Sequence, residues 1–226
     1  MEAVILVGGL GTRLQEVVPD VPKPLASIRG TPFLSLLLKN LPFERVILAV
    51  GHRADQIISC YQNHPFPFDI QFSVESEPLG TGGALIHALS MIKGPLFWVL
   101  NGDSYFAIDF EKMEEAHLQT GADLTIASLE VEEVSRYGSL EFDPSTRRIT
   151  HFSEKAEKKG AGWISGGIYL FQKEVLSCFS LKSFSLEKEG FPHLLNKRCF
   201  MYPSRGAFID IGTKESYSLA QDLLIS

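Results

Sequence analysis

The sequence of 226 residues has little cysteine. It contains Cys60, Cys178 and Cys199, with no Cys-x-x-Cys pair among them, and its six histidines show no metal-ligand spacing. A small, odd number of cysteines argues against a disulfide framework and against a zinc site. We therefore expect the cysteines to be small buried apolar residues, and we expect the protein to work in a reducing compartment, the cytoplasm.

Long hydrophobic runs are also lacking. The apolar segments at residues 3–7 and 96–100 are far shorter than the roughly 20 residues that a bilayer-spanning helix needs. The second residue is an acid, Glu2, where a signal peptide carries a base. The sequence therefore predicts neither an export signal nor a membrane segment, and no membrane partner.

There is no excess of positive charge. Lys and Arg number 21 against 27 for Asp and Glu, which gives a formal net charge of −6. A mildly acidic chain is a poor general binder of nucleic acid, because phosphate contacts need clustered cations. Small phosphate-bearing molecules stay open, since they need only one local basic site. The 45% of hydrophobic and 21% of charged residues are typical of a globular protein.

Short apolar runs do alternate with amphipathic stretches of helical length up to about residue 130. We predict strands at residues 3–7, 46–50, 70–74, 96–100 and 124–129. We predict helices at 31–38, 54–61, 83–92 and 110–120, the first capped by Thr31 with Pro32 at its first position. This alternation predicts an α/β fold, with a Rossmann-like, mixed, mainly parallel sheet and helices on both faces.

The alternation of predicted strands and helices ends after about residue 130. A turn at Asp143-Pro-Ser-Thr146 separates strands at 139–142 and 149–152, which predicts a hairpin. Further strands are predicted at 163–171, 199–202 and 207–211, and helical segments at 184–195 and 214–224. Because no repeat or long linker is present, we expect one domain over residues 1–226, with a nucleotide-type half at about 1–130 and a more antiparallel half at about 131–226.

The most informative segment follows the first strand. It reads Leu6-Val-Gly8-Gly9-Leu-Gly11-Thr12-Arg13, and Lys23-Pro24 comes soon after. Glycines let the backbone turn sharply, and successive free N–H groups form a cradle for anions. The spacing matches neither a dinucleotide fingerprint nor a P-loop. A turn required only for strand packing is the alternative, which Arg13 and Lys23 make less favourable because they place two cations beside the loop.

These residues resemble the signature of the sugar-nucleotide pyrophosphorylases, nucleotidyltransferases that join a sugar 1-phosphate to a nucleoside triphosphate. The likeness continues along the chain with Glu77-Pro-Leu-Gly-Thr-Gly-Gly, Asn101-Gly-Asp103, Tyr137-Gly138, Glu154-Lys155, Ser165-Gly-Gly and Phe208-Ile-Asp210. One departure is Ser165, where the family has Asn.

The resemblance implies roles for particular residues. The implied catalytic residues are Arg13, Lys23 and Asp103. The implied nucleotide contacts are Leu6, Gly8, Gly9, Gly11, Thr12, Arg13, Glu77, Pro78, Gly80, Thr81, Gly82 and Gly102. The implied contacts of the sugar phosphate, in the half at about 131–226, are Tyr137, Gly138, Glu154, Lys155, Gly166 and Gly167. The implied ligands of a Mg²⁺ cofactor are Asp103 and Asp210.

The residues themselves leave alternatives open. Asp103 follows a buried strand, where open α/β sheets bind ligands, but it could equally be a turn or helix N-cap residue. Asp210 lies among apolar residues, as a metal ligand or a member of a buried salt bridge. The glycines at 80–83 could be a helix-entry turn or could let the backbone approach a base. Glu154-Lys155 begins a charged run that by itself would be a solvated loop.

The resemblance implies GMP transfer from GTP to a heptose 1-phosphate for surface polysaccharide. The alternatives are mannose 1-phosphate as acceptor, or UTP, CTP or dTTP as donor. A non-catalytic nucleotide-sugar sensor is the alternative from another class, but it would be expected to lose Arg13, Lys23 or the two aspartates, and all are present. A homo-oligomer stays open.

Overall fold

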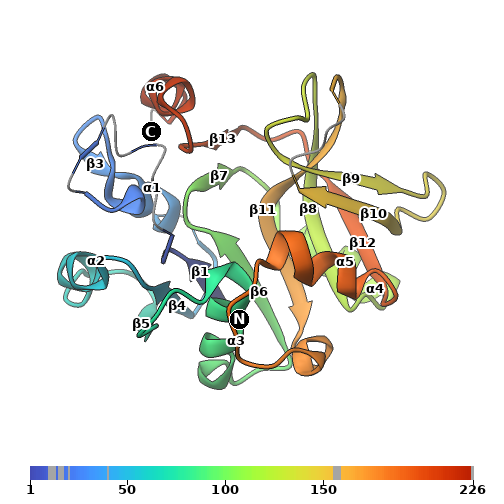
Figure 1. Cartoon of the computed structure of the whole chain (residues 1–226), viewed down its shortest axis with the longest axis horizontal. Coiled ribbons are helices and arrows are strands. Elements are labelled where there is room, and N and C mark those ends of the chain that lie inside the picture. The colour runs from blue at the N-terminus through green and yellow to red at the C-terminus, as the bar shows by residue number, and fades with distance from the viewer. Residues whose placement is uncertain (10–13, 15–17, 20, 40, 155–158, 225–226) are drawn as a thin grey trace.

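A nine-stranded sheet forms the centre of the protein (Figure 1). The structure, a computed structural model, describes residues 1–226 except 10–13, 15–17, 20, 40, 155–158 and 225–226. The strands of the sheet are β1 (Glu2–Leu6), β4 (Arg45–Val50), β5 (Asp69–Val74), β6 (Leu96–Asn101), β8 (Leu124–Val131), β9 (Gly138–Phe142), β10 (Ile149–Glu154), β11 (Gly162–Gln172) and β12 (Cys199–Pro203).

The centre of the sheet is parallel and one side of it is antiparallel. In the order β10-β9-β11-β6-β1-β4-β5, strand β1 pairs in parallel with β4 and β6, and β4 with β5. Strand β11 pairs antiparallel with β6, β8 and β9, and β12 runs parallel to β8. The predicted mixed sheet is therefore confirmed, and β11 joins the later half of the chain directly to the earlier half.

Helices cover both faces of the sheet, as predicted. Ala3 and Ile5 of β1 pack in one hydrophobic cluster, and Val4, which points to the opposite face, packs in another. The first cluster takes side chains from α1 (Phe33–Leu38), α2 (Ala54–Tyr61), α4 (Phe110–Thr120) and α6 (Lys214–Leu223). The second takes them from α3 (Gly80–Ala88), α5 (Phe191–Leu194) and the 3₁₀ helix η3 (Lys173–Cys178).

The predicted start of the first helix is wrong. Thr31 and Pro32 form strand β3 (Thr31–Pro32), which pairs with β2 (Ser27–Ile28), and α1 begins at Phe33 without a side-chain cap. The reason is a tight turn between the two strands, in which Arg29 and Gly30 both have positive φ values of 47° and 87°. The hairpin holds Thr31 in an extended conformation, so its side chain does not cap the helix.

Other short elements differ from the prediction at their boundaries. Helix α3 begins at Gly80 and continues into η2 (Leu89–Met91), and the segment predicted as helical from 184 starts as a π-helical turn, η4 (Leu186–Gly190), before α5. A 3₁₀ turn, η1 (Lys23–Leu25), follows the first loop. Within the part of the chain that the structure describes, no helix is long and apolar enough to traverse a bilayer.

A second, two-stranded sheet was not predicted in full. Strand β7 (Ser104–Phe106) pairs antiparallel with β13 (Phe208–Asp210), so that Asp210 lies opposite Ser104. The backbone N–H of Ile211 also donates to the carbonyl of Asp103 at 2.9 Å. This small sheet places the C-terminal part of the chain above the end of β6 (Figure 1).

Candidate active site

A cleft of about 840 Å³ opens at the carboxyl ends of the parallel strands. Its floor is formed by residues that follow β1, β4, β5 and β6, among them Gly8, Gly51, Glu75 and Gly102. Open α/β sheets bind ligands at this edge because the loops there are free of the sheet's own pairing. The opposite wall comes from β9, β10, β11, η4 and β13.

Most of the described residues that the sequence nominated line this one cleft. They are Leu6, Gly8, Gly9, Lys23, Glu77, Pro78, Gly80, Thr81, Gly102, Asp103, Tyr137, Gly138, Glu154, Gly167 and Asp210. Gly11, Thr12, Arg13 and Lys155 lie outside the described residues. Gly82 and Gly166 do not line the cleft: a Cβ on them would come within 2.1 Å of the Phe184 ring and 2.2 Å of the Phe106 ring, respectively.

The two described glycines of the first loop have different surroundings. A Cβ on Gly8 would lie 2.4 Å from Oε1 of Glu75, whereas a Cβ on Gly9 would meet nothing within 4 Å. Gly8 therefore permits close packing inside the protein, and Gly9 leaves open space. Glu75 accepts a hydrogen bond from the N–H of Leu79 at 2.7 Å, and desolvation raises the pKa of its carboxyl. Sequence reasoning missed Glu75, although it is an acid directly after a strand.

Lys23 and Asp103 form an ion pair across 80 residues of sequence. Nζ of Lys23 lies 2.5 Å from Oδ2 of Asp103, and Ser104 donates to Oδ1 at 3.1 Å. The side chain of Lys23 is 13% exposed and that of Asp103 is 42% exposed, so the carboxylate is the more accessible partner. Desolvation alone would raise the pKa of Asp103, but the charge and hydrogen bond of Lys23 hold it below its ordinary value. Since β7 follows Asp103, this residue caps no helix.

Asp210 approaches this pair from the other small strand. Its Oδ1 accepts from the N–H of Gly212 at 2.8 Å, while its Oδ2 is buried and has no hydrogen-bond partner among the described residues. A Cβ on Gly212 would lie 2.6 Å from Oδ1 of Asp210 and 3.4 Å from Nζ of Lys23, so this glycine keeps the space between the two side chains open. No described residue forms a salt bridge with Asp210, which removes that alternative for the described part of the chain.

The donor set fits a hard divalent cation. The carboxylates of Asp103 and Asp210 both line the cleft, and the buried Oδ2 of Asp210 is an acceptor that lacks a donor. The described residues contain no group of three or more His, Cys, Asp or Glu side chains that could hold a metal alone. Mg²⁺ is commonly bound by one or two carboxylates together with substrate phosphates, so two aspartates are sufficient.

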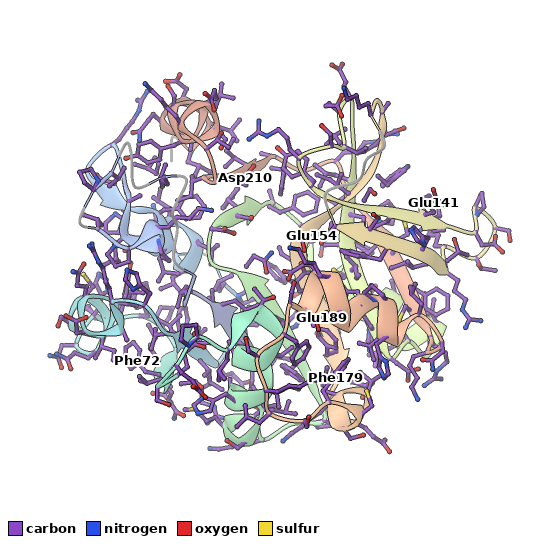
Figure 2. All side chains as sticks on the ribbon, in the orientation of Figure 1. Phe72, Glu141, Glu154, Phe179, Glu189 and Asp210 are labelled. Atoms are coloured by element: carbon purple, nitrogen blue, oxygen red, sulfur yellow. The ribbon has the colours of Figure 1, made fainter. Side chains whose placement is uncertain are left out.

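The wall opposite the glycine loop carries acidic side chains, and Lys188 of η4 adds a cation to it. Figure 2 shows Glu154 of β10 and Asp210 of β13, which enter the cleft from different elements. Oε2 of Glu154 is buried without a hydrogen-bond partner among the described residues. Desolvation and then the charge of Asp210 raise the pKa of Tyr137. Ser165 uses its hydroxyl within the protein, donating to Tyr169 at 3.2 Å.

Other polar side chains line the cleft without having been assigned a role from the sequence. Asn101, Arg136 and Glu187 line it, and Arg136 donates to Oγ1 of Thr213 at 3.1 Å. The position of Asn101 at the end of a buried strand was a usable signal. The segment Phe184-Ser-Leu-Glu187 is part of the likeness to the family, but the likeness gave Glu187 no role. Its side chain reaches the cleft through tertiary packing.

Comparisons with known proteins found relatives in both sequence and fold. The family model described as "Nucleotidyl transferase" matches residues 2–225. The D-glycero-alpha-D-manno-heptose 1-phosphate guanylyltransferase of Aneurinibacillus thermoaerophilus is 38% identical over 226 residues, covering 98% of this chain and 97% of the relative. The protein of that name from Campylobacter jejuni is 38% identical over 224 residues, covering 96% and 97%. The crystal structure of HddC from Yersinia pseudotuberculosis complexed with GMP-PN superimposes with a TM-score of 0.86 at 38% identity, covering 98% of both chains.

Proposed function

This chain belongs to the nucleotidyl transferase family, and we propose that it transfers GMP from GTP to D-glycero-α-D-manno-heptose 1-phosphate. A phosphate oxygen of the sugar phosphate forms a bond to the α-phosphorus of GTP. The bond from that phosphorus to the bridging oxygen of the β-phosphate breaks, and pyrophosphate leaves. The product is GDP-heptose, an activated sugar for surface polysaccharide.

One observation supports the proposal: a single cleft brings together described residues from every motif, although these residues are scattered along the sequence from Leu6 to Asp210. The nucleophile is already an anion, so the reaction needs no general base. Its barrier lies in bringing two polyanions together and in stabilising charge on the leaving group. The protein therefore has to supply positioning and electrostatic stabilisation.

The phosphate end of the cleft has residues for this task. Gly8 and Gly9 offer backbone N–H groups to the triphosphate, and Lys23 provides a cation that is already held at Asp103. Arg13 completes this end in the proposal and follows the charge onto pyrophosphate. Glu77, Pro78 and Gly80 hold the base and ribose.

Asp103 and Asp210 would hold Mg²⁺ at the junction of the nucleotide and sugar-phosphate halves. When bound, such an ion neutralises phosphate charge and orients phosphate oxygens. The two aspartates need no further protein ligand if substrate phosphates complete the coordination. Tyr137, Glu154 and Lys155 bind the sugar phosphate, with Lys155 as its counter-charge.

The test is pyrophosphate release with Mg²⁺, crossing GTP, CTP, UTP, dTTP and ATP with heptose, mannose and glucose 1-phosphates. We expect turnover to be confined to GTP with D-glycero-α-D-manno-heptose 1-phosphate. Preference for another pair would retain nucleotidyl transfer but change the substrate. If folded protein showed no turnover with any pair in the grid, this result would contradict the proposed enzymatic activity and favour a nucleotide-sugar sensor.

A further inference from the structure

One carboxylate in the wall formed by β9, β10, β11, η4 and β13, the sugar-side wall of the cleft, has no role assigned from the sequence. Glu187 lies in η4, the π-helical turn that precedes α5, and lines the cleft together with Glu154 of β10. Desolvation raises the pKa of Glu187, a hydrogen bond from Thr81 opposes the shift, and the charge of Glu154 adds to it. Two acidic groups therefore lie in the same wall of the cleft.

Glu187 is held in place by residues on two elements. The hydroxyl of Thr81 donates to its Oε2 at 2.6 Å, and that of Ser185 donates to the same oxygen at 3.3 Å. Thr81 also accepts from the N–H of Leu186 at 2.9 Å. The single hydroxyl proton of Thr81 is thus used on Glu187, although sequence resemblance assigned this residue to the nucleotide.

The backbone around this contact is closely packed. The N–H of Gly82 donates to the carbonyl of Phe184 at 3.0 Å, and the N–H of Phe184 donates to the carbonyl of Leu79 at 3.0 Å. A Cβ on Gly80 would lie 2.6 Å from that Phe184 carbonyl. The glycines of α3 therefore allow residues 182–186 to dock on the helix start, and this docking fixes the direction in which Glu187 points.

One oxygen of these two carboxylates is buried without a donor among the described residues. The hydroxyls of Thr81 and Ser185 both donate to Oε2 of Glu187, and Oε2 of Glu154 is a buried acceptor without a partner among the described residues. Buried acceptors without donors are costly, so a ligand that brings hydrogen-bond donors gains from binding here. Sugar hydroxyls are such donors. A carboxylate on the sugar would instead add a third like charge.

We propose that Glu187, positioned by Thr81 and Ser185, binds hydroxyl groups of the acceptor sugar together with Glu154, and thereby selects neutral sugar 1-phosphates against those of uronic acids. The inference rests on the proposed function, because it takes the ligand of this wall to be the acceptor. Thr81 acts through Glu187 as a positioning residue. The rival explanation is that the Thr81–Glu187 contact only docks η4 onto α3.

Binding and turnover together test the proposal. Calorimetry gives the Kd of heptose 1-phosphate, glucose 1-phosphate and glucuronate 1-phosphate for the wild type and for Glu187→Gln, Thr81→Val and Thr81→Ser. We expect Glu187→Gln to raise the Kd of heptose 1-phosphate about tenfold, which is the size expected for the loss of a hydrogen bond to a charged group. We expect the preference for glucose over glucuronate 1-phosphate to narrow by a similar factor, and the KM for GTP to change less than twofold.

The two threonine variants separate positioning from docking. Thr81→Val should weaken the binding of the sugar phosphates in the same pattern as Glu187→Gln. Thr81→Ser keeps the hydroxyl and should therefore bind them with the wild-type affinities. The matched control is Glu189→Gln, which removes an exposed charge from the same segment (Figure 2) but keeps the oxygen that accepts from the N–H of Ser185 at 3.0 Å. This variant should leave all three Kd values unchanged.

The outcomes distinguish this inference from the function on which it rests. Two results in Glu187→Gln would overturn the role of Glu187. One is an unchanged ratio of the Kd for glucuronate 1-phosphate to the Kd for glucose 1-phosphate, and the other is an equal loss of affinity for sugar phosphate and for GTP. Loss of thermal stability in Thr81→Val without a change in the Kd ratio would establish docking alone. Failure of the wild type to turn over any pair in the substrate grid would instead contradict the proposed function, while the Kd ratios would still decide what the wall binds.

Discussion

The cleft and the packing beneath helix α4 both contain buried polar atoms that lack a hydrogen-bond partner among the described residues. In the cleft they are Oδ1 of Asn101, Oε2 of Glu154 and Oδ2 of Asp210. Beneath α4 the atom is Nε2 of His117, whose Nδ1 pairs with the Thr125 hydroxyl at 2.8 Å. Each such atom lowers the stability of the fold by about 1–3 kcal/mol, so its presence in either region needs an explanation.

The difference lies in what can reach the atom. The three cleft atoms are acceptors along a space of about 840 Å³, so a ligand can supply the missing donor or cation. His117 is 1% exposed and nothing can reach it. Burial lowers the pKa of His117 to about 4, so its ring stays neutral. The cleft atoms should therefore affect activity, whereas His117 should affect stability.

The largest expected effect comes from replacing an acceptor in the cleft. Asp210→Asn retains an oxygen for the N–H of Gly212 but places an amide where the unpaired Oδ2 lies. We expect kcat to fall about 10²–10³-fold, as for removal of other electrostatic contacts. The required Mg²⁺ concentration should rise, and the free energy of unfolding should stay close to that of the wild type. Steady-state kinetics across a Mg²⁺ titration, with urea unfolding, measures both.

Asp109→Asn is the control for that variant. Asp109 is an exposed carboxylate that caps α4 and pairs with Lys112 at 2.6 Å, away from the cleft. Its replacement should lower stability slightly and leave kcat and Mg²⁺ dependence unchanged. If Asp210→Asn behaved like Asp109→Asn, Asp210 would have no part in the metal site.

An intermediate effect, on folding stability, is expected when the pH is lowered and His117 becomes protonated. Because its pKa is lowered from 6.5 to about 4, the unfolded state binds the proton first, so stability is lost as pH falls through this window. Between pH 7 and pH 4.5 the loss is about 2–3 kcal/mol. Asp123 and Arg198 act on the ring with opposite charges, and both stay ionised over this range.

His117→Gln should flatten this pH dependence by the same amount, measured by urea unfolding at both pH values. At pH 7 its kcat should equal that of the wild type, since His117 does not line the cleft. The exposed His151 provides the matched control, because His151→Gln should retain the wild-type slope. An unaltered slope in His117→Gln would show that other groups cause the acid sensitivity.

The smallest effect is expected from narrowing the space beside Asp210. In Gly212→Ala the new methyl group would displace Oδ1 of Asp210, and it would press on Lys23 only slightly. We expect kcat to fall about tenfold, since small displacements of catalytic groups are costly. Thermal unfolding should change little. Gly94→Ala, whose Cβ would meet only ordinary contacts at 3.5 Å or more, is the control, and equal kcat values in both variants would contradict the expected displacement.

Local sequence determined much of the fold. Helix α4 was predicted at its observed bounds, and the strands at 46–50 and 96–100 to within one residue at either end, because hydrophobic periodicity is a local property. The failure at Thr31 also has a local cause, since the turn at Arg29-Gly30 outweighed a favourable helix cap. Strand β7 escaped prediction because it has only three residues and depends on β13 for its pairing.

Sequence by itself determined which residues gather at the strand ends, because a parallel strand delivers its following loop to one edge of the sheet. Only the tertiary structure decided how they meet. It pairs Lys23 with Asp103, places Asp210 opposite Ser104, and joins Thr81 to Glu187 by a hydrogen bond. These partners lie about 80 or more positions apart, and their contacts depend on how the whole chain packs.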